Sequence, residues 1–186
     1  MTGAPAAGWL LISSAILVEP PFARTIILLL NVDADGSLGV VLNRPSHVAV
    51  GEVLGGWGPV VATPEVIFRG GPVDTDSALG VATLVGGEDE PIGWSRLFAD
   101  TGLVDLDAPT EVIGSATAAM RIYAGYAGWS AGQLEDEIDE GAWYVVPAER
   151  SDLFSPDPDL LWRQVLRRQG AELALMITMP ADPTLN

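Results

Sequence analysis

Two stretches of this 186-residue chain carry residue types at spacings typical of catalytic or metal sites. Residues 128–132, Gly-Trp-Ser-Ala-Gly, match the G-x-S-x-G pattern in which a nucleophilic Ser stands between a strand and a helix. A hydrolase of that kind needs a His that follows the Ser in the chain. The chain has one His, His47, and it precedes Ser130. We therefore interpret Ser130 as a helix cap rather than a nucleophile, and we assign no catalytic residue.

The second stretch is a turn that matches part of a calcium loop. Asn31, Asp33, Asp35 and Gly36 fit the first, third, fifth and sixth positions of such a loop. The twelfth position needs a bidentate Glu, and here it is Leu42. Strand-like residues flank the turn on both sides, which favours a hairpin. We predict no metal site and no cofactor.

Two arginines stand in short motifs that could bind an anion. The motifs are Asn43-Arg44-Pro45 and Arg69-Gly70-Gly71-Pro72. A guanidinium suits bidentate capture of carboxylate or phosphate, and paired glycines let the backbone approach a ligand or another strand closely. The candidate ligand-binding residues are Asn43, Arg44, Arg69, Gly70 and Gly71. Alternatively, each Arg pairs with an internal acid, and Gly-Gly-Pro is a plain turn, because it lacks the Lys and Ser/Thr of a phosphate loop.

Residues 125–146 form the most distinctive stretch of the chain. Ser130 and Gln133 have the spacing of a capping box, which predicts a helix that begins at Ala131. Gly141 is well placed to end that helix in a left-handed conformation. Aromatic and β-branched residues at 143–146 then predict a strand.

The remaining elements follow from apolar periodicity and turn residues. We expect further strands at 9–13, 25–32, 38–42, 66–68, 78–85, 103–106, 120–126 and 173–179. We expect further helices at 50–57, 109–113, 148–154 and 159–169. Hairpins come first and short helices lie between later strands, which favours an α+β fold over a doubly wound sheet. The expected core aromatics are Phe22, Tyr126, Trp129, Trp143 and Trp162.

Composition is typical of a folded, soluble protein. With 48% hydrophobic and 18% charged residues, we expect one domain over residues 1–186, with residues 1–7 disordered. The apolar run at 8–18 is too short to span a bilayer and lacks the basic flank of a signal peptide. We therefore expect a cytoplasmic protein that does not bind membranes.

The charge of the chain bears on its partners. Acids outnumber bases 25 to 9, all nine bases are Arg, and the net charge is −16. Nucleic acid is a polyanion that needs a basic surface, so direct binding to it is disfavoured. A basic protein partner fits the charge better.

Several motifs occur in the order seen in one bacterial family. They are residues 8–24 (GWLLISSAILVEPPFAR), 39–45 (GVVLNRP), 69–73 (RGGPV), 125–138 (GYAGWSAGQLEDEI) followed by Ala142-Trp143, 152–154 and 161–162. By these motifs the chain is identified as a member of the YqgE/AlgH family. Two histidine motifs common in the family are absent: Leu30-Asn31 stands in place of Glu-His, and Leu-His is missing from residues 78–83.

The resemblance implies a mixed, strongly bent sheet curled into a pseudo-barrel, with short helices packed outside. It also implies a structural role for the family signature, which comprises Gly125, Tyr126, Trp129, Gly132, Gln133, Leu134, Glu135 and Trp143. The family's biochemical activity is not established, and its label of transcriptional regulator rests on genetics.

Three functional hypotheses remain. The preferred one is a non-enzymatic binding or regulatory protein that acts through a protein partner or a small anionic ligand. An enzyme would have to use carboxylates such as Glu19, Asp74 or Asp76, none of which is singled out by spacing. A transcriptional regulator would act without contacting DNA directly. The oligomeric state and the identity of the partner stay open.

Overall fold

In a computed structural model, which describes residues 3–18, 20–86 and 89–178, the strands join into a single sheet. Their order is β10-β1-β2-β3-β9-β6-β8-β7, with β5 parallel to β9 and β4 paired to β5. The strands are β1 (Trp9–Ser13), β2 (Ile26–Asp33), β3 (Gly36–Val41), β4 (Pro45–Ala49), β5 (Val66–Arg69), β6 (Val73–Leu84), β7 (Trp94–Phe98), β8 (Thr101–Val104), β9 (Thr117–Ser130) and β10 (Trp143–Pro147).

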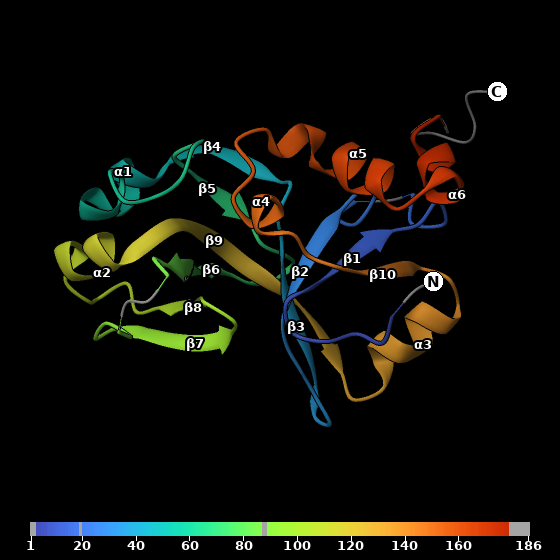
Figure 1. The fold of residues 1–186 in the computed structure, drawn as a ribbon, viewed down its shortest axis with the longest axis horizontal. Helices are drawn as coiled ribbons and strands as arrows, with labels where there is room; N and C mark the ends of the chain where they lie inside the picture. The colour runs from blue at the N-terminus through green and yellow to red at the C-terminus, as the bar shows by residue number, and fades with distance from the viewer. Residues whose placement is uncertain (1–2, 19, 87–88, 179–186) are drawn as a thin grey trace.

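Short helices lie outside this sheet, which curls into a half-barrel, so the fold is α+β as expected (Figure 1). The helices are α1 (Val50–Val53), α2 (Thr110–Ala116), α3 (Gln133–Asp139), α4 (Arg150–Leu153), α5 (Pro158–Arg168) and α6 (Ala171–Ala174), with 3-10 turns η1 (Gly55–Trp57) and η2 (Leu175–Thr178). In Figure 1, α5 and α6 lie above β1 and β2, whereas α1 and α2 lie at the other end of the molecule.

Strand β9 joins the two halves of the sheet. One end of this strand pairs with β3 through residues 127–130, and its middle pairs with β5 and β6. Opposite Gly125, the pairing jumps from Val73↔Tyr126 to Ala78↔Ala124, so residues 74–77 bulge out of β6. Such a bulge redirects side chains at the point where the strand bends.

The core has three parts, and strand β2 separates two of them. Its residues are apolar at both odd and even positions, as expected of a strand buried on both faces. Leu28 and Leu30 face a cluster closed by α5, whereas Ile27 and Leu29 face a cluster with Trp129, Trp143 and α3. A third cluster joins β6, β8 and β9 to α1, η1 and α2. Of the expected core aromatics, Trp129, Trp143 and Trp162 are buried, whereas Phe22 and Tyr126 are half-buried.

One expectation about the C-terminal end of the chain was wrong. Residues 173–178 form α6 and η2 rather than a strand, and Met179 lies outside the described residues. The reason is spacing: Leu173, Met176 and Ile177 pack against the core at intervals of three and four, which is the period of a helix. Disorder was expected for residues 1–7, and within the described residues 3–7 the Gly3 N–H donates to Val145 O of β10, the strand at one end of the sheet.

Candidate functional site

The two candidate arginines border the same pocket. Arg44 follows β3 and Arg69 ends β5. The backbones of these two segments are joined by a hydrogen bond from Arg69 N to Arg44 O at 2.8 Å. The pocket has a volume of about 520 Å³. Thr75, from the bulge in β6, adds a hydroxyl group. Most of the remaining lining is apolar and comes from Pro20, Pro21, Ala23, Val41, Pro72 and Ala124.

Arg44 is half-buried and bonded only to neutral oxygens of the described chain. Its Nη1 donates to Asn43 O at 3.0 Å, and its Nη2 donates to Ala23 O and to Thr25 Oγ1. These bonds leave its Nε–H and one Nη1–H without a partner among the described residues. Burial lowers the pKa of the guanidinium, an effect that the negative charge of Asp159 only partly offsets.

Arg69 is exposed, and its side chain has no hydrogen bond or ion pair within the part of the chain that the structure describes. Arg44 likewise makes no ion pair there. The alternative, in which each Arg forms an ion pair with an internal acid, is therefore not observed among the described residues. Two cations border an apolar pocket, and neither is directly neutralised by a described carboxylate.

The other three candidates have mainly structural contacts. Asn43 is buried, does not line the pocket, and bridges Ile26 N and Arg24 O at 2.9 Å each. Gly70 must be small, because a Cβ there would lie 2.2 Å from Gly125 O. Gly71 does line the pocket, and its own Cβ would clash with the backbone of Tyr126. The two glycines thus permit the close approach of another strand, β9, which was one of the two expected reasons for them.

The signature stretch forms an aromatic cluster beside α3. The rings of Trp129 and Trp143 meet edge to face at 6.1 Å, and Phe22 meets Trp143 at 5.6 Å. Both indole N–H groups donate to Glu137 Oε2, at 2.9 and 2.8 Å, while Gln133 Nε2 donates to Glu137 Oε1 at 3.0 Å. Sequence reasoning missed Glu137, although two buried indoles signal the need for an acceptor nearby.

The rest of the signature fits the same structural role. Leu134 is buried, Glu135 is exposed, and Gly132 takes a left-handed conformation (φ +77°) as the N-cap of α3. Gly125 is also left-handed (φ +68°), and a Cβ there would lie 2.7 Å from the carbonyl oxygens of Gly71 and Val73. The signature therefore touches the pocket wall through Gly125.

The predicted capping box is only half formed. Ser130 N and Ser130 Oγ both bond to Gln133 Oε1, at 3.0 and 3.1 Å. The helix begins at Gln133 rather than Ala131, since Gly132 supplies the turn into it. Ser130 is therefore not the N-cap that the spacing predicted, because Gly132 takes that position and the Ser130 hydroxyl bonds to the Gln133 side chain rather than to its backbone N–H.

The calcium-like turn is a hairpin. Asn31 Nδ2 donates to Asp33 Oδ2, and Asp35 N donates to Asp33 Oδ1 at 2.9 Å. These bonds lower the pKa of Asp33, the Asn31 side chain contributing most. Among the described residues, no group of three or more His, Asp or Glu side chains is arranged to hold a metal ion.

Arg121 is a buried cation that sequence reasoning did not single out. It lies in β9 at 1% exposure and donates to Thr63 O, Leu153 O and Ser155 O at 3.0–3.4 Å. Burial lowers its pKa, and burial raises the pKa of the neighbouring Tyr123 to about 12. Since its donors meet backbone carbonyls, Arg121 fastens the segment around α4 to the sheet.

Comparisons with known proteins agree with the family resemblance that the sequence motifs indicated. A family model described as AlgH-like matches residues 10–174. The chain belongs to the AlgH-like family. A UPF0301 protein of Streptomyces coelicolor is 54% identical over 182 residues, covering 96% of this chain and 94% of that protein. This is a family of uncharacterised proteins, so the function has to be argued from the site.

Two solved structures are similar to this fold. A crystal structure of a Corynebacterium diphtheriae protein has a TM-score of 0.90 at 35% identity, covering 96% of this chain and 95% of that one. The solution structure of AlgH from Pseudomonas aeruginosa has a TM-score of 0.71 at 27% identity, covering 97% of each. In the described part of this AlgH-like chain, no helix is long and apolar enough to cross a membrane.

Proposed function

We propose that this chain is a non-enzymatic binding module that takes a small organic anion in the pocket of Arg44 and Arg69. The observation that carries the proposal is the pairing of two guanidinium groups with an otherwise mostly apolar lining in one pocket of about 520 Å³. Apolar walls with a few convergent polar groups are typical of small-molecule sites. The ligand would carry a carboxylate or phosphate group on an apolar body.

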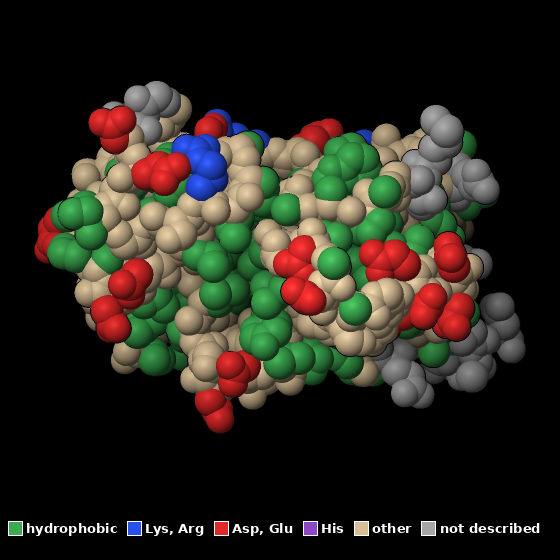
Figure 2. Space-filling view, turned by 90° about the horizontal axis from the view of Figure 1, so that it is seen from below, with side chains coloured by type: hydrophobic (Ala, Val, Ile, Leu, Met, Phe, Trp, Pro, Cys, Tyr) green, Lys and Arg blue, Asp and Glu red, His purple; other side chains and the backbone are tan. Residues whose placement is uncertain are grey.

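The overall charge strengthens this reading. A chain with 25 acids and 9 bases offers many partners for a structural Arg, yet none of the described carboxylates pairs with Arg44 or Arg69. The face seen in Figure 2 likewise has acidic side chains scattered widely and Arg in few places. Leaving two cations unneutralised suits a site that an anion completes.

The pocket favours binding over carboxylate chemistry. No Asp or Glu among the described residues lines it, so the described lining offers no general acid or base of the carboxylate type. We propose that the protein acts in the bacterial cytoplasm, and that a protein partner there binds differently to the ligand-bound and ligand-free forms. Any effect on transcription would then pass through that partner, because the net charge of −16 opposes direct contact with DNA.

A thermal-melt screen tests the proposal. The protein is heated with a panel of organic carboxylates and phosphates, each matched by its neutral amide or alcohol. A ligand at a hundred times its dissociation constant adds about 2.7 kcal/mol of stability, which raises the melting midpoint visibly. We expect anions to raise the midpoint and their neutral counterparts not to.

Arg69→Gln is the decisive variant, because the side chain is exposed and unbonded among the described residues and its loss should not disturb folding. We expect it to lose the anion-induced rise. Arg163→Gln, an exposed Arg on α5, is the control that makes the same change in net charge. The proposal fails if no anion stabilises the protein, or if Arg69→Gln responds as fully as Arg163→Gln.

A further inference from the structure

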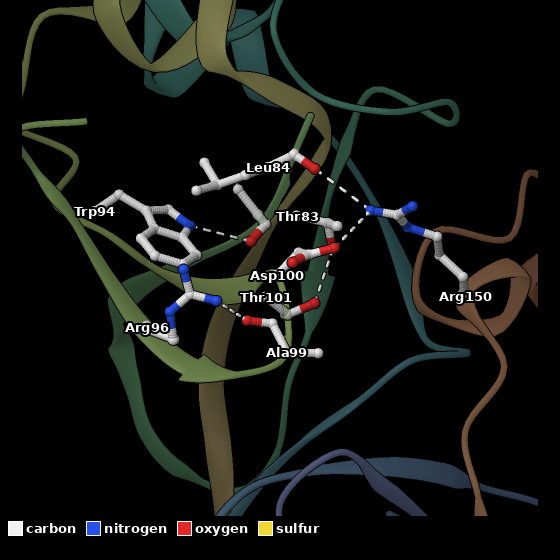
Figure 3. A network of polar contacts seen from close by, with 9 residues as sticks. Thr83, Leu84, Trp94, Arg96, Ala99, Asp100, Thr101 and Arg150 are labelled. Atoms are coloured by element: carbon white, nitrogen blue, oxygen red, sulfur yellow. Dashed lines mark hydrogen bonds and ion pairs between the residues drawn. The ribbon is translucent and has the colours of Figure 1, made fainter. Parts of the chain in front are cut away.

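A second cleft lies between the turn that joins β7 to β8 and the segment that joins β10 to α4. Its volume is about 530 Å³, similar to that of the Arg44 pocket, with which it shares no lining residue. Its polar lining comes from Thr83, Asp100, Thr101, Glu149 and Arg150. Its apolar lining includes Trp9, Phe98, Pro147 and Leu153. Figure 3 shows most of the polar groups close together.

The cleft contains a buried pair of hydroxyl groups. Thr83 and Thr101 are 3% and 4% exposed, and their Oγ1 atoms lie 2.8 Å apart (Figure 3). One proton forms this hydrogen bond, so one of the two hydroxyl protons has no acceptor among the described residues. A buried donor without an acceptor destabilises the fold, and an oxygen atom of a ligand in the cleft would satisfy it.

The charged groups of the cleft are already paired. Arg150 Nη2 lies 3.5 Å from Asp100 Oδ2 and donates to Leu84 O at 3.3 Å (Figure 3). Glu149 Oε1 lies 3.4 Å from Arg168 Nε, and Arg168 in turn pairs with Asp152. A ligand with a net charge would meet both signs here. A neutral ligand with many donors and acceptors can bond to these groups without separating any pair.

Contacts outside the cleft hold its polar side in place. Arg96 donates to Ala99 O in the β7–β8 turn and pairs with Glu90 at 2.7 Å. Trp94 Nε1 donates to Ala82 O at 3.2 Å, which fixes β7 against β6 (Figure 3). Asp100 and Thr101 are therefore presented on a braced turn, so a ligand has little to order when it binds.

We infer that this cleft binds a neutral polyhydroxylated molecule of monosaccharide or cyclitol size. The hydroxyl groups of such a ligand would donate to Asp100 and Glu149 and accept from Arg150 and the free Thr proton. Its C–H groups would contact the apolar lining. The inference is independent of the anion pocket, because the lining, the charge state and the ligand class all differ.

A titration followed by NMR tests this inference. Isotope-labelled protein is titrated with glucose and with myo-inositol, and amide shifts are followed. We expect saturable shifts at residues 83, 99–101 and 148–150. Thr83→Val/Thr101→Val replaces the hydroxyl pair with groups of the same shape, so we expect an unchanged fold and at least a tenfold weaker affinity.

Two further samples keep the test decisive. Thr178→Val removes an exposed hydroxyl far along the chain and should bind as the natural protein does. If the double variant does not fold, Arg150→Met should weaken binding in its place. The inference is overturned if neither polyol gives saturable shifts, if the double valine variant binds equally well, or if glutamate shifts the same amides more strongly than either polyol.

Discussion

The aromatic cluster beside α3 and the pocket of Arg44 and Arg69 differ in whether their hydrogen-bond donors have partners. In the cluster, the donors of Trp129, Trp143 and Gln133 all meet Glu137, so the chain satisfies itself. In the pocket, guanidinium N–H groups remain without partners among the described residues. The most recognisable stretch of the sequence is thus satisfied by internal bonds, and the guanidinium donors without described partners lie in two shorter motifs.

Removing an aromatic ring from the cluster should have the largest effect. Trp143→Ala should destabilise the protein by about 3–5 kcal/mol, because a buried ring and its cavity are both at stake. Denaturant unfolding would measure the loss. Trp143→Phe keeps an aromatic ring in the cluster and loses the N–H and part of the ring volume, so its cost should be smaller. A loss below about 1 kcal/mol for the alanine variant would contradict the role of the cluster as scaffold.

Gly125→Ala should affect both regions, since Gly125 connects them. The left-handed backbone costs about 1–2 kcal/mol with a Cβ, and crowding against Gly71 O and Val73 O adds about 1–3 kcal/mol. We also expect weaker anion binding, because Gly71 must shift. Gly128→Ala is the matched control, since its Cβ would lie 3.4 Å from the Tyr126 ring. Equal melting midpoints for the two variants would contradict this.

Glu137→Gln should cost about 1 kcal/mol, because the amide is neutral and has one acceptor oxygen where the carboxylate uses two. Denaturant unfolding, together with the indole N–H signals of Trp129 and Trp143 in NMR spectra, would measure it. Glu135→Gln, at an exposed neighbouring position, removes the same charge and should change stability by less than about 0.5 kcal/mol. A similar effect of both substitutions would mean that charge alone matters.

Arg69→Gln should have the smallest effect on stability, within about 0.5 kcal/mol, and should still abolish the response to anions. Arg44→Gln should differ, since it breaks bonds to Ala23 O and Thr25 Oγ1 and should lower the melting midpoint even without ligand. Melting curves with and without an anion would separate the two arginines. A large loss in ligand-free Arg69→Gln would place this residue with the scaffold.

Local patterns predicted much of the fold. Strand β2, with apolar residues at every buried position, and α5, with its apolar stripe, were both expected, and α5 was placed within one residue at each end. The α+β class followed from the order of elements. The C-terminal segment failed because a short apolar run does not by itself distinguish a strand from a helix.

The sites were less predictable, because their parts come from distant stretches. Arg44 and Arg69 could be found from their motifs. Thr75 lines the pocket because β6 bulges at residues 74–77, and no sequence pattern predicted that bulge. Arg121 was not anticipated, since an isolated Arg in a strand gives no sign of its three carbonyl acceptors. The cleft of Thr83 and Thr101 depends on β6 and β8 being neighbours, which is a property of the folded sheet.

The position of β9 also has a consequence during synthesis. This strand pairs with β3 and β6, whose residues precede it by up to about ninety positions, and it is the direct neighbour of both in the sheet. Until residue 130 has left the ribosome, the β2–β3 hairpin and the three strands β6, β8 and β7 have apolar faces and no strand to join them. Since exposed strand edges can pair with other chains, a nascent chain that ends before β9 leaves the edges of β3 and β6 open to such association.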